Sequence, residues 1–251
     1  MNIPSTARAA PRFRPPLAVG VVVIDLDGTL IHTAPDLAAS ANAMLADLGL
    51  PQRSQAEVEQ WIGNGVARLV KRALTGRRDG EPDPALFERG YGAFLEHYGR
   101  LLTRASRPYP GVRAGLARLA EEGYRLACIT NKAERFTRPL LEALDLARHF
   151  ELVLSGDSLP KKKPDPLPLL HACRHFGIAP AAGLLVGDSA NDTQAAQAAG
   201  MPVICVTYGY HQGRDLAALG AVALIDSLEE LPQYIRPLPR SRPRPSPEHR
   251  S

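Results

Sequence analysis

The pattern of hydrophobic and polar positions changes twice along the chain. Residues 19–24 read Val-Gly-Val-Val-Val-Ile, which predicts a strand buried on both faces of a parallel sheet. From about 34 to 105 the apolar residues recur at helical spacing, without strand-like alternation. From 109 to 206, strand-length apolar runs alternate with helical segments. The expected helices are 35–48, 54–61, 66–74, 84–102, 113–122, 134–144, 167–176 and 191–199, and the later strands are 124–131, 150–154, 183–188 and 201–206.

This alternation predicts an α/β fold with a doubly wound parallel sheet, because strands separated by helices form right-handed crossovers. A helical block inserted after the first strand must bury its own apolar face, so it is expected to be a separate small domain. We therefore expect a core of residues 18–33 and 106–235 and a helical domain of residues 34–105. Residues 1–17 and 236–251 are rich in Pro and Arg and are expected to be disordered tails.

The charge is concentrated in these tails. They carry +7 against a net charge of +4 for the whole chain, which leaves −3 for residues 18–235. A slightly acidic folded part gives no support for nucleic-acid binding. The apolar runs are far shorter than the roughly 18 residues of a membrane span, so no membrane partner is expected. The three cysteines fall in predicted strands or helices, typical of small core side chains in a reducing cytoplasm: Cys128, Cys173 and Cys205.

Polar residues that can carry chemistry follow several of the predicted strands. Asp25 and Asp27 end the first strand, Thr130 and Asn131 follow the next, and Asp188 ends a later one. In open α/β sheets, ligands bind beyond the carboxyl ends of the strands. Two acids there without a neighbouring base require a cation, or a phosphate together with a cation.

The segment Asp25-Leu26-Asp27-Gly28-Thr29-Leu30 resembles the DxDGT signature of the haloacid dehalogenase (HAD) superfamily. The other three motifs of that superfamily follow in order as Thr130, Lys163 and the segment 187–192, Gly-Asp-Ser-Ala-Asn-Asp. The resemblance covers residues 19–210 and implies a Rossmann-like HAD core with a small α-helical cap at 34–105.

This resemblance implies the role of each acid. Asp25 is expected to be the nucleophile that forms an aspartyl-phosphate, and Asp27 the acid that protonates the leaving group and then activates water. A Mg²⁺ cofactor is expected on the Asp25 and Asp188 carboxylates and the Asp27 main-chain carbonyl. Because an alkoxide leaves poorly without a proton, Asp27 favours a phosphatase or a phosphomutase.

The remaining motif residues are expected to hold phosphate or support the metal ligands. Lys163 is expected to pair with Asp25 and the phosphate, whereas Lys161 and Lys162 are expected to be solvated. The Thr130 hydroxyl and the Asn131 N–H are expected to bind phosphate oxygens. Just outside the metal ligands we expect Ser189 and Asp192, the latter one helical turn after Asp188.

Two stretches of the cap block, 30–37 and 61–69, resemble phosphoglycolate phosphatases. At His32 and Thr33 most of that family has an acid and Ser, and His32 is expected to influence the pH dependence at a hinge. A phosphoglycolate substrate needs a cation for its carboxylate. Arg68 is the expected candidate, with Lys71 and Arg72 as alternates, and a solvated helix face remains the alternative for each.

The favoured interpretation is a Mg²⁺-dependent phosphomonoesterase that hydrolyses 2-phosphoglycolate, a small phosphate-ester substrate, in the cytoplasm. The alternatives are a sugar-phosphate phosphatase or β-phosphoglucomutase-like HAD enzyme, and a receiver that only holds phosphate on Asp25. A monomer or a homodimer is expected.

Overall fold

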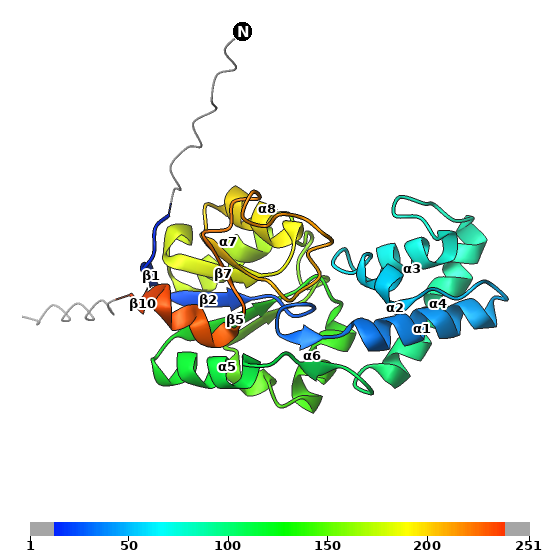
Figure 1. Ribbon diagram of the computed structural model, residues 1–251, viewed down its shortest axis with the longest axis horizontal. Helices are drawn as coiled ribbons and strands as arrows, with labels where there is room; N and C mark the ends of the chain where they lie inside the picture. The colour runs from blue at the N-terminus through cyan, green and yellow to red at the C-terminus, as the bar shows by residue number, and fades with distance from the viewer. Residues whose placement is uncertain (1–12, 239–251) are drawn as a thin grey trace, which may run out of the picture.

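The computed structural model describes residues 13–238, and its centre is a parallel sheet of six strands (Figure 1). Every neighbouring pair in this sheet is parallel. The predicted parallel α/β fold is therefore confirmed. In spatial order the strands are β6 (Leu152–Leu154), β5 (Arg125–Ile129), β2 (Val21–Ile24), β7 (Gly183–Gly187), β8 (Val203–Val206) and β9 (Ala223–Ile225).

The central strand β2 is fully buried because it contributes to two apolar layers at once. Val22 and Ile24 belong to one core cluster, and Val21 and Val23 belong to the other. Alternate residues of a strand point to opposite faces of the sheet, so each face needs its own apolar cover.

Helices cover both faces. The first face packs against α5 (Val112–Glu121) and α6 (Glu134–Ala143), through residues such as Leu116 and Leu140. The second face packs against α7 (Leu167–Phe176) and α8 (Ala190–Ala199), the latter through a stripe of alanines. In Figure 1 these two helix pairs lie on opposite sides of the sheet, with α7 and α8 uppermost.

The block between the first strand and α5 is helical, as predicted, and forms the separate right-hand lobe of Figure 1. We call this lobe the cap. Its helices are α1 (Ala34–Asp47), α2 (Gln55–Glu59), α3 (Val66–Thr75) and α4 (Pro84–Leu101). Side chains cap two of the helix starts: Ser54 accepts the Glu57 N–H, and Asp83 accepts the Leu86 N–H.

The two connections between core and cap run side by side. Short strands β3 (Ile31–His32) and β4 (Arg107–Pro108) pair antiparallel there. Buried Asp36, in the first turn of α1, accepts the backbone N–H groups of Ala105 and Ser106 from the other connection. A buried carboxylate that accepts several N–H groups joins the two connections firmly.

The predicted tail boundaries were wrong by a few residues. Strand β1 (Leu17–Val19) pairs in parallel with β10 (Ile235–Pro237), so Leu17, Arg236 and Pro237 belong to the fold. Both Leu17 and Ile235 are buried, which explains why the chain continues past the expected limits. Residues 1–12 and 239–251 of the predicted tails lie outside the described residues.

The other differences are small. The strand expected at 150–154 begins at Leu152, because Ala147–His149 forms a 3₁₀ turn before it. Two further 3₁₀ turns, Pro180–Ala182 and Leu228–Gln233, were not predicted. The three cysteines are buried and free, as expected of core side chains. No helix within residues 13–238 has the length and hydropathy needed to cross a membrane.

Candidate active site

The predicted motif residues meet at the carboxyl ends of the three central strands. Strand β2 lies between β5 and β7, so Asp25, Thr130 and Asp188 follow neighbouring strands. Lys163 comes from the loop after β6. These residues border one cavity of about 40 Å³ beneath the cap. Its walls are formed by Asp25, Asp27, Leu37, Ile62, Gly63, Gly65, Val66, Leu69, Thr130, Asn131, Lys132, Lys163, Asp188, Ser189, Asn191 and Tyr210.

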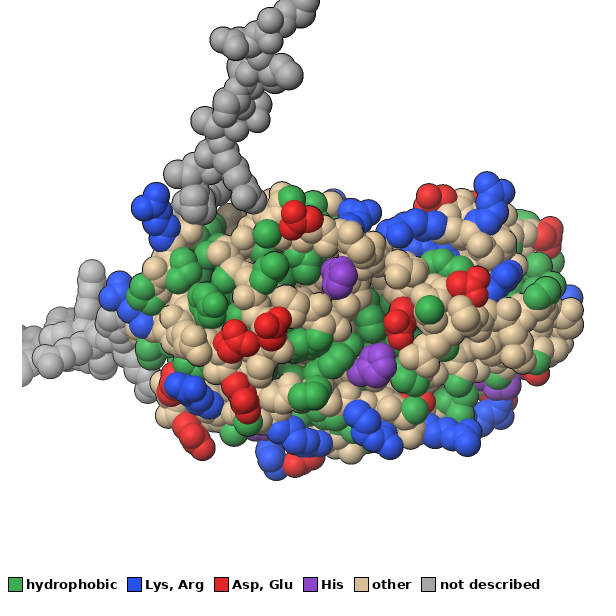
Figure 2. Space-filling model, in the orientation of Figure 1, with side chains coloured by type: hydrophobic (Ala, Val, Ile, Leu, Met, Phe, Trp, Pro, Cys, Tyr) green, Lys and Arg blue, Asp and Glu red, His purple; other side chains and the backbone are tan. Residues whose placement is uncertain are grey.

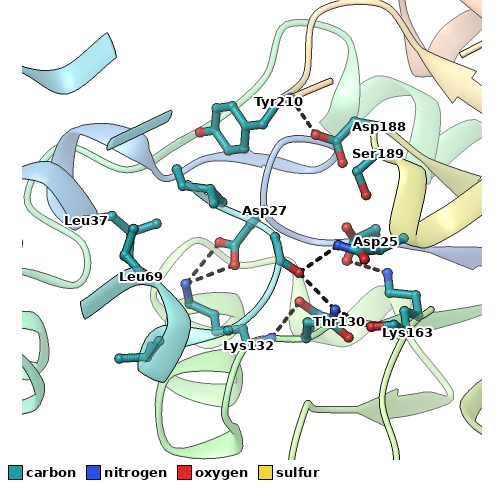
Figure 3. Close-up of a pocket in the computed structure, with 16 residues that line it drawn as sticks. Asp25, Asp27, Leu37, Leu69, Thr130, Lys132, Lys163, Asp188, Ser189 and Tyr210 are labelled. Carbon is teal, nitrogen blue, oxygen red and sulfur yellow. Dashed lines mark hydrogen bonds and ion pairs between the residues drawn. The ribbon is translucent and has the colours of Figure 1, made fainter. Parts of the chain in front are cut away.

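Lys163 lies between the carboxylates of Asp25 and Asp192, and Figure 3 shows its contact with Asp25. Its Nζ is 2.8 Å from Asp25 Oδ1 and 2.7 Å from Asp192 Oδ1, and all three side chains are buried. Burial alone would lower the pKa of Lys163, but the two carboxylates outweigh it and raise that pKa. The ammonium therefore stays charged beside Asp25, the partner expected for Lys163 from the sequence.

Asp192 supports this arrangement from the first turn of α8. Its second oxygen accepts hydrogen bonds from the Ser189 N–H at 3.1 Å and the Ser189 hydroxyl at 2.6 Å. Both oxygens of this fully buried carboxylate are thus occupied by donors. Asp192 is thus one of the clustered acids, and Ser189 lies against it.

Asp188 is fixed by donors on both of its oxygens. Thr29 Oγ1 donates to Oδ1 at 3.2 Å, and the Tyr210 N–H donates to Oδ2 at 2.5 Å. A side chain on Gly28 would place its Cβ 2.2 Å from Asp188 Oδ2, and Gly28 also has φ +87°. Only glycine satisfies both conditions, which explains the Gly in this turn.

The charges of this cluster fit a divalent cation. Oxygens of Asp25, Asp188 and Asp192 lie within 4.8 Å of one another. Burial, and next the neighbouring Asp192, raises the pKa of Asp25 to about 7, even though Lys163 opposes the shift. Burial, and next the neighbouring Asp192 and Asp25, raise the pKa of Asp188 well above its usual value. Clustered hard oxygens whose charges are only partly balanced suit Mg²⁺.

Asp27 lies apart from that cluster, on the cap side of the cavity (Figure 3). Its Oδ1 accepts a 2.7 Å hydrogen bond from Thr33 Oγ1 and lies 3.0 Å from Lys132 Nζ. The Lys132 side chain is 2 % exposed, and its ammonium also donates to the Tyr98 hydroxyl of α4 at 2.5 Å. Lys132 was not predicted as a site residue, although it directly follows the Thr130-Asn131 motif at a strand end.

The remaining phosphate candidates, Thr130 and Asn131, also border the cavity. Thr130 Oγ1 accepts the Lys132 N–H at 3.2 Å. The Asn131 side chain has a role that was not predicted: its amide donates to the Gly63 carbonyl of the cap at 2.9 Å and to the Lys163 carbonyl at 2.8 Å. Asn131, which follows β5, thus connects the cap to the loop that carries Lys163.

Three consecutive carbonyls of the cap, at 62–64, accept hydrogen bonds from the core. Gln212 donates to Ile62, Asn131 and Asn191 donate to Gly63, and Lys162 donates to Asn64. We call residues 61–65 the cap loop. Lys162 is exposed, as expected of a solvated lysine, and its ammonium also donates to the loop at 3.0 Å.

The cap cations do not face the cavity, contrary to expectation. Arg68 pairs with Glu81 at 2.5 Å and with Asp79 at 3.2 Å, and Lys71 pairs with Glu81. These acids lie on the same surface and neutralise both cations; Figure 2 shows basic and acidic side chains interspersed over the cap. Arg72 is buried, where it donates to the Trp61 carbonyl and braces the cap loop.

His32 lies at the hinge, as expected, but within a cluster of tyrosines. Its Nδ1 is 3.0 Å from the Tyr210 hydroxyl and 3.2 Å from the Tyr109 hydroxyl. The Tyr210 hydroxyl also accepts the N–H groups of Thr33 and Ala34. Tyr210, which follows strand β8, therefore connects the Asp188 carboxylate to the start of the cap, a role that was not predicted.

A parallel sheet with paired acids at the end of its central strand, and a buried lysine against the first acid, defines an α/β enzyme of phosphoryl-transfer type. The chain matches the haloacid dehalogenase-like hydrolase family over residues 22–206, and it belongs to that family. The family predicted from the sequence is thereby confirmed.

Comparison with known proteins shows which members of this family the chain resembles. The chain is 58% identical over 215 residues to a phosphoglycolate phosphatase of Thiobacillus denitrificans, covering 86% of this chain and 95% of that one. It is 54% identical to the phosphoglycolate phosphatase of Nitrosospira multiformis, covering 88% and 97%. A crystal structure from Haemophilus somnus 129PT, described as a predicted phosphoglycolate phosphatase, superposes with a TM-score of 0.80 at 38% identity, covering 85% and 96%.

Proposed function

We propose that this protein is a Mg²⁺-dependent phosphomonoesterase that hydrolyses 2-phosphoglycolate to glycolate and phosphate through an aspartyl-phosphate on Asp25. The observation that carries the proposal is the separation of the two acids. Asp25 lies with Lys163 among the clustered carboxylates, whereas Asp27 faces the cap and is held by Thr33 and Lys132. One acid is placed for the phosphoryl group and the other for the leaving group.

In the first step, an Asp25 carboxylate oxygen attacks phosphorus and the bond from phosphorus to the ester oxygen breaks. Asp27 delivers its proton to that oxygen, so glycolate leaves as an alcohol rather than an alkoxide. Lys163 beside Asp25 offsets the repulsion between the carboxylate and the phosphate dianion. The hydroxyl of Thr130 is available to a phosphate oxygen.

In the second step, Asp27 takes a proton from a water molecule that attacks the phosphorus of the aspartyl-phosphate. The bond between phosphorus and Asp25 breaks, which releases phosphate and restores the Asp25 carboxylate. Thr33 and Lys132 keep Asp27 in one place for both proton transfers. A positioned acid that serves in both directions is typical of a two-step displacement.

The residues that would hold Mg²⁺ are Asp25 and Asp188 through their carboxylates and Asp27 through its main-chain carbonyl. Asp192 is less suited, since it does not border the cavity, whereas Asp25 and Asp188 do. The bound ion supplies positive charge between the nucleophile and the phosphate.

The lining of the cap side supports a small leaving group. Leu37, Ile62, Val66 and Leu69 bring apolar side chains to the cavity. A sugar would lose hydrogen bonds from its hydroxyl groups against such a wall, which costs free energy for each unpaired group. A two-carbon acid presents a single methylene there. This argues for glycolate over a sugar phosphate.

A phosphate-holding receiver is less well supported, because Asp27 and the cap serve release of an alcohol and have no use in a protein that only retains phosphate. We place the reaction in the cytoplasm, which agrees with three free cysteines. Whether the enzyme acts as a monomer or a homodimer stays a prediction.

The test is a set of initial rates on phosphate esters with and without Mg²⁺. We expect kcat/KM for 2-phosphoglycolate to exceed that for glucose 6-phosphate and other sugar phosphates by at least about tenfold, and turnover to stop when EDTA removes the metal. Equal rates on sugar phosphates would instead support the alternative class. Undiminished turnover in EDTA would show that the reaction does not require a metal ion.

A further inference from the structure

Among the described residues that border the cavity, the only cations are Lys132 and Lys163. Lys163 is fully engaged by Asp25 and Asp192 at the phosphate end. Lys132 lies at the other end, against Asp27 and the cap (Figure 3). Any negative charge carried by the leaving group must therefore be met by Lys132 or be left unpaired in the cavity.

We propose that Lys132 binds the carboxylate of the substrate and selects phosphate esters that carry one, and that Tyr98 of the cap holds it in position. This inference rests on the proposed function and names the residue that recognises the carboxylate of the glycolate group. It assigns to a core lysine the role expected of a cap cation such as Arg68.

The position of Asp27 fixes where that carboxylate lies. To protonate the ester oxygen, Asp27 must come within hydrogen-bond reach of it. In 2-phosphoglycolate only one methylene separates the ester oxygen from the carboxylate carbon, so the carboxylate oxygens lie roughly 2.5–3.5 Å from the ester oxygen. Lys132 Nζ is already 3.0 Å from Asp27 Oδ1. A pose that lets Asp27 act can therefore bring the carboxylate next to this ammonium.

The hydrogen-bond inventory of Lys132 leaves room for this contact. An ammonium has three donors. One is directed to the Tyr98 hydroxyl at 2.5 Å and another to Asp27 Oδ1, whereas the contact with Asp27 Oδ2 is the longest at 3.3 Å. The entering carboxylate can replace this third contact without displacing the other two.

Tyr98 makes the arrangement rigid. It is fully buried on α4, and its ring packs against Phe94 of the cap and Phe136 of the core with centroids 5.6 and 4.8 Å away. The Lys132 ammonium also lies 4.8 Å from the centroid of that ring. Because these contacts already hold the Lys132 ammonium, its side chain loses little conformational freedom when it binds an anion.

The test compares two non-hydrolysable analogues on the Mg²⁺-loaded enzyme. In 3-phosphonopropionate a methylene replaces the ester oxygen of phosphoglycolate, and in propylphosphonate a methyl group further replaces the carboxylate. Calorimetry gives the ratio of their dissociation constants. We expect the wild type to bind 3-phosphonopropionate roughly 10- to 150-fold more tightly, the range for a hydrogen bond to a charged group.

Lys132→Met should abolish this preference while it changes the affinity for propylphosphonate less than about threefold. A preference retained by Lys132→Met overturns the proposal. Tyr98→Phe, which keeps the ring, should reduce the preference by roughly 2- to 10-fold. If Lys132→Met does not fold, as judged by circular dichroism, Tyr98→Phe decides: an unchanged preference overturns the proposal.

Arg68→Met is the matched control, since it removes a cap cation that does not border the cavity. Arg68→Met should keep the full preference for 3-phosphonopropionate, and loss of this preference in Arg68→Met would overturn the assignment to Lys132. The proposed function fails separately: it fails if the wild type does not favour 2-phosphoglycolate among the esters, whatever the analogues show.

Discussion

The two halves of the cavity differ in chemistry and in how they are held. The core half is charged, and its acids and lysine follow strands of a rigid parallel sheet. The cap half is apolar, and it is fastened to the core through backbone carbonyls at 62–64 that accept side-chain hydrogen bonds. We propose that the core carries out phosphoryl transfer while the apolar wall of the cap limits the size of the leaving group.

The largest effect is expected from Asp25→Asn in the core half. An amide cannot form the aspartyl-phosphate, so kcat should fall at least about 10⁴-fold for every ester tested. The buried contact with Lys163 can persist through the amide oxygen, and the fold should be retained. Asp215→Asn, an exposed acid remote from the motifs, serves as the control and should keep the wild-type rate.

Asp27→Asn should lower the rate on 2-phosphoglycolate by about 10²- to 10⁴-fold, the usual contribution of general acid–base catalysis. The loss in the phosphorylation step should be much smaller for p-nitrophenyl phosphate, whose leaving group departs without a proton. Stopped-flow measurement of the first turnover checks this. An equal loss in that step for both esters would contradict the role given to Asp27.

Stability of the metal-free protein should depend on pH through the clustered acids. The pKa of Asp25 is about 7 in the folded protein and near 3.8 when unfolded, so the folded state holds its proton to higher pH. Stability is therefore greatest below about pH 4 for this group and falls by an amount on the order of a few kcal/mol as pH rises to about 7. Mg²⁺ should restore it.

Thermal melting with EDTA and with excess Mg²⁺, at several pH values between 4 and 8, measures this effect. The gain in Tm on adding Mg²⁺ should increase with pH, because protons compete with the ion for Asp25 and Asp188. A gain that is the same at pH 4 and pH 8 would speak against these two ligands.

A smaller effect is expected where the cap meets the core. Asn191→Ala removes one of the two amide donors to the Gly63 carbonyl, a neutral hydrogen bond worth about 0.5–1.5 kcal/mol. We expect KM for 2-phosphoglycolate to rise roughly 2- to 10-fold, since the cap loop is held less firmly. A full loss of kcat would mean that Asn191 takes part in the chemistry.

The smallest effect is expected for Arg68→Met on the cap surface. Asp79 and Glu81, the acids that pair with Arg68, are exposed, so these ion pairs contribute about 0–1 kcal/mol to the free energy of unfolding. The kinetic constants for 2-phosphoglycolate should change less than about twofold. A large rise in KM would show that the cap arginine reaches the substrate after all.

The core half could be predicted from the sequence because each motif ends a strand. The β-branched run before Asp25 indicated a central strand, and parallel strands bring their carboxyl ends together, so Asp188 and Thr130 had to lie near Asp25. Lys163 could be chosen from three lysines through the resemblance and because Pro164 follows it, and the structure shows it between Asp25 and Asp192.

The cap half could not be predicted in the same way. A helix pattern shows which face is apolar but not which distant groups its cations meet, so Arg68 was assigned to the cavity although Glu81 lies beside it. The pairing of Lys132 with Tyr98 joins residues 34 positions apart on different lobes. Such contacts depend on how the cap docks, which no local pattern encodes.

The division of labour between Asp25 and Asp27 is tested most directly by trapping the phosphoenzyme. Asp27→Asn is mixed with p-nitrophenyl phosphate and Mg²⁺, quenched in acid, and digested for mass spectrometry. We expect a burst of about one p-nitrophenol per active site, followed by slow turnover, with the phosphoryl group on the peptide that contains Asp25. Absence of both the burst and the phosphorylated peptide, while turnover proceeds at the wild-type rate, would contradict the account.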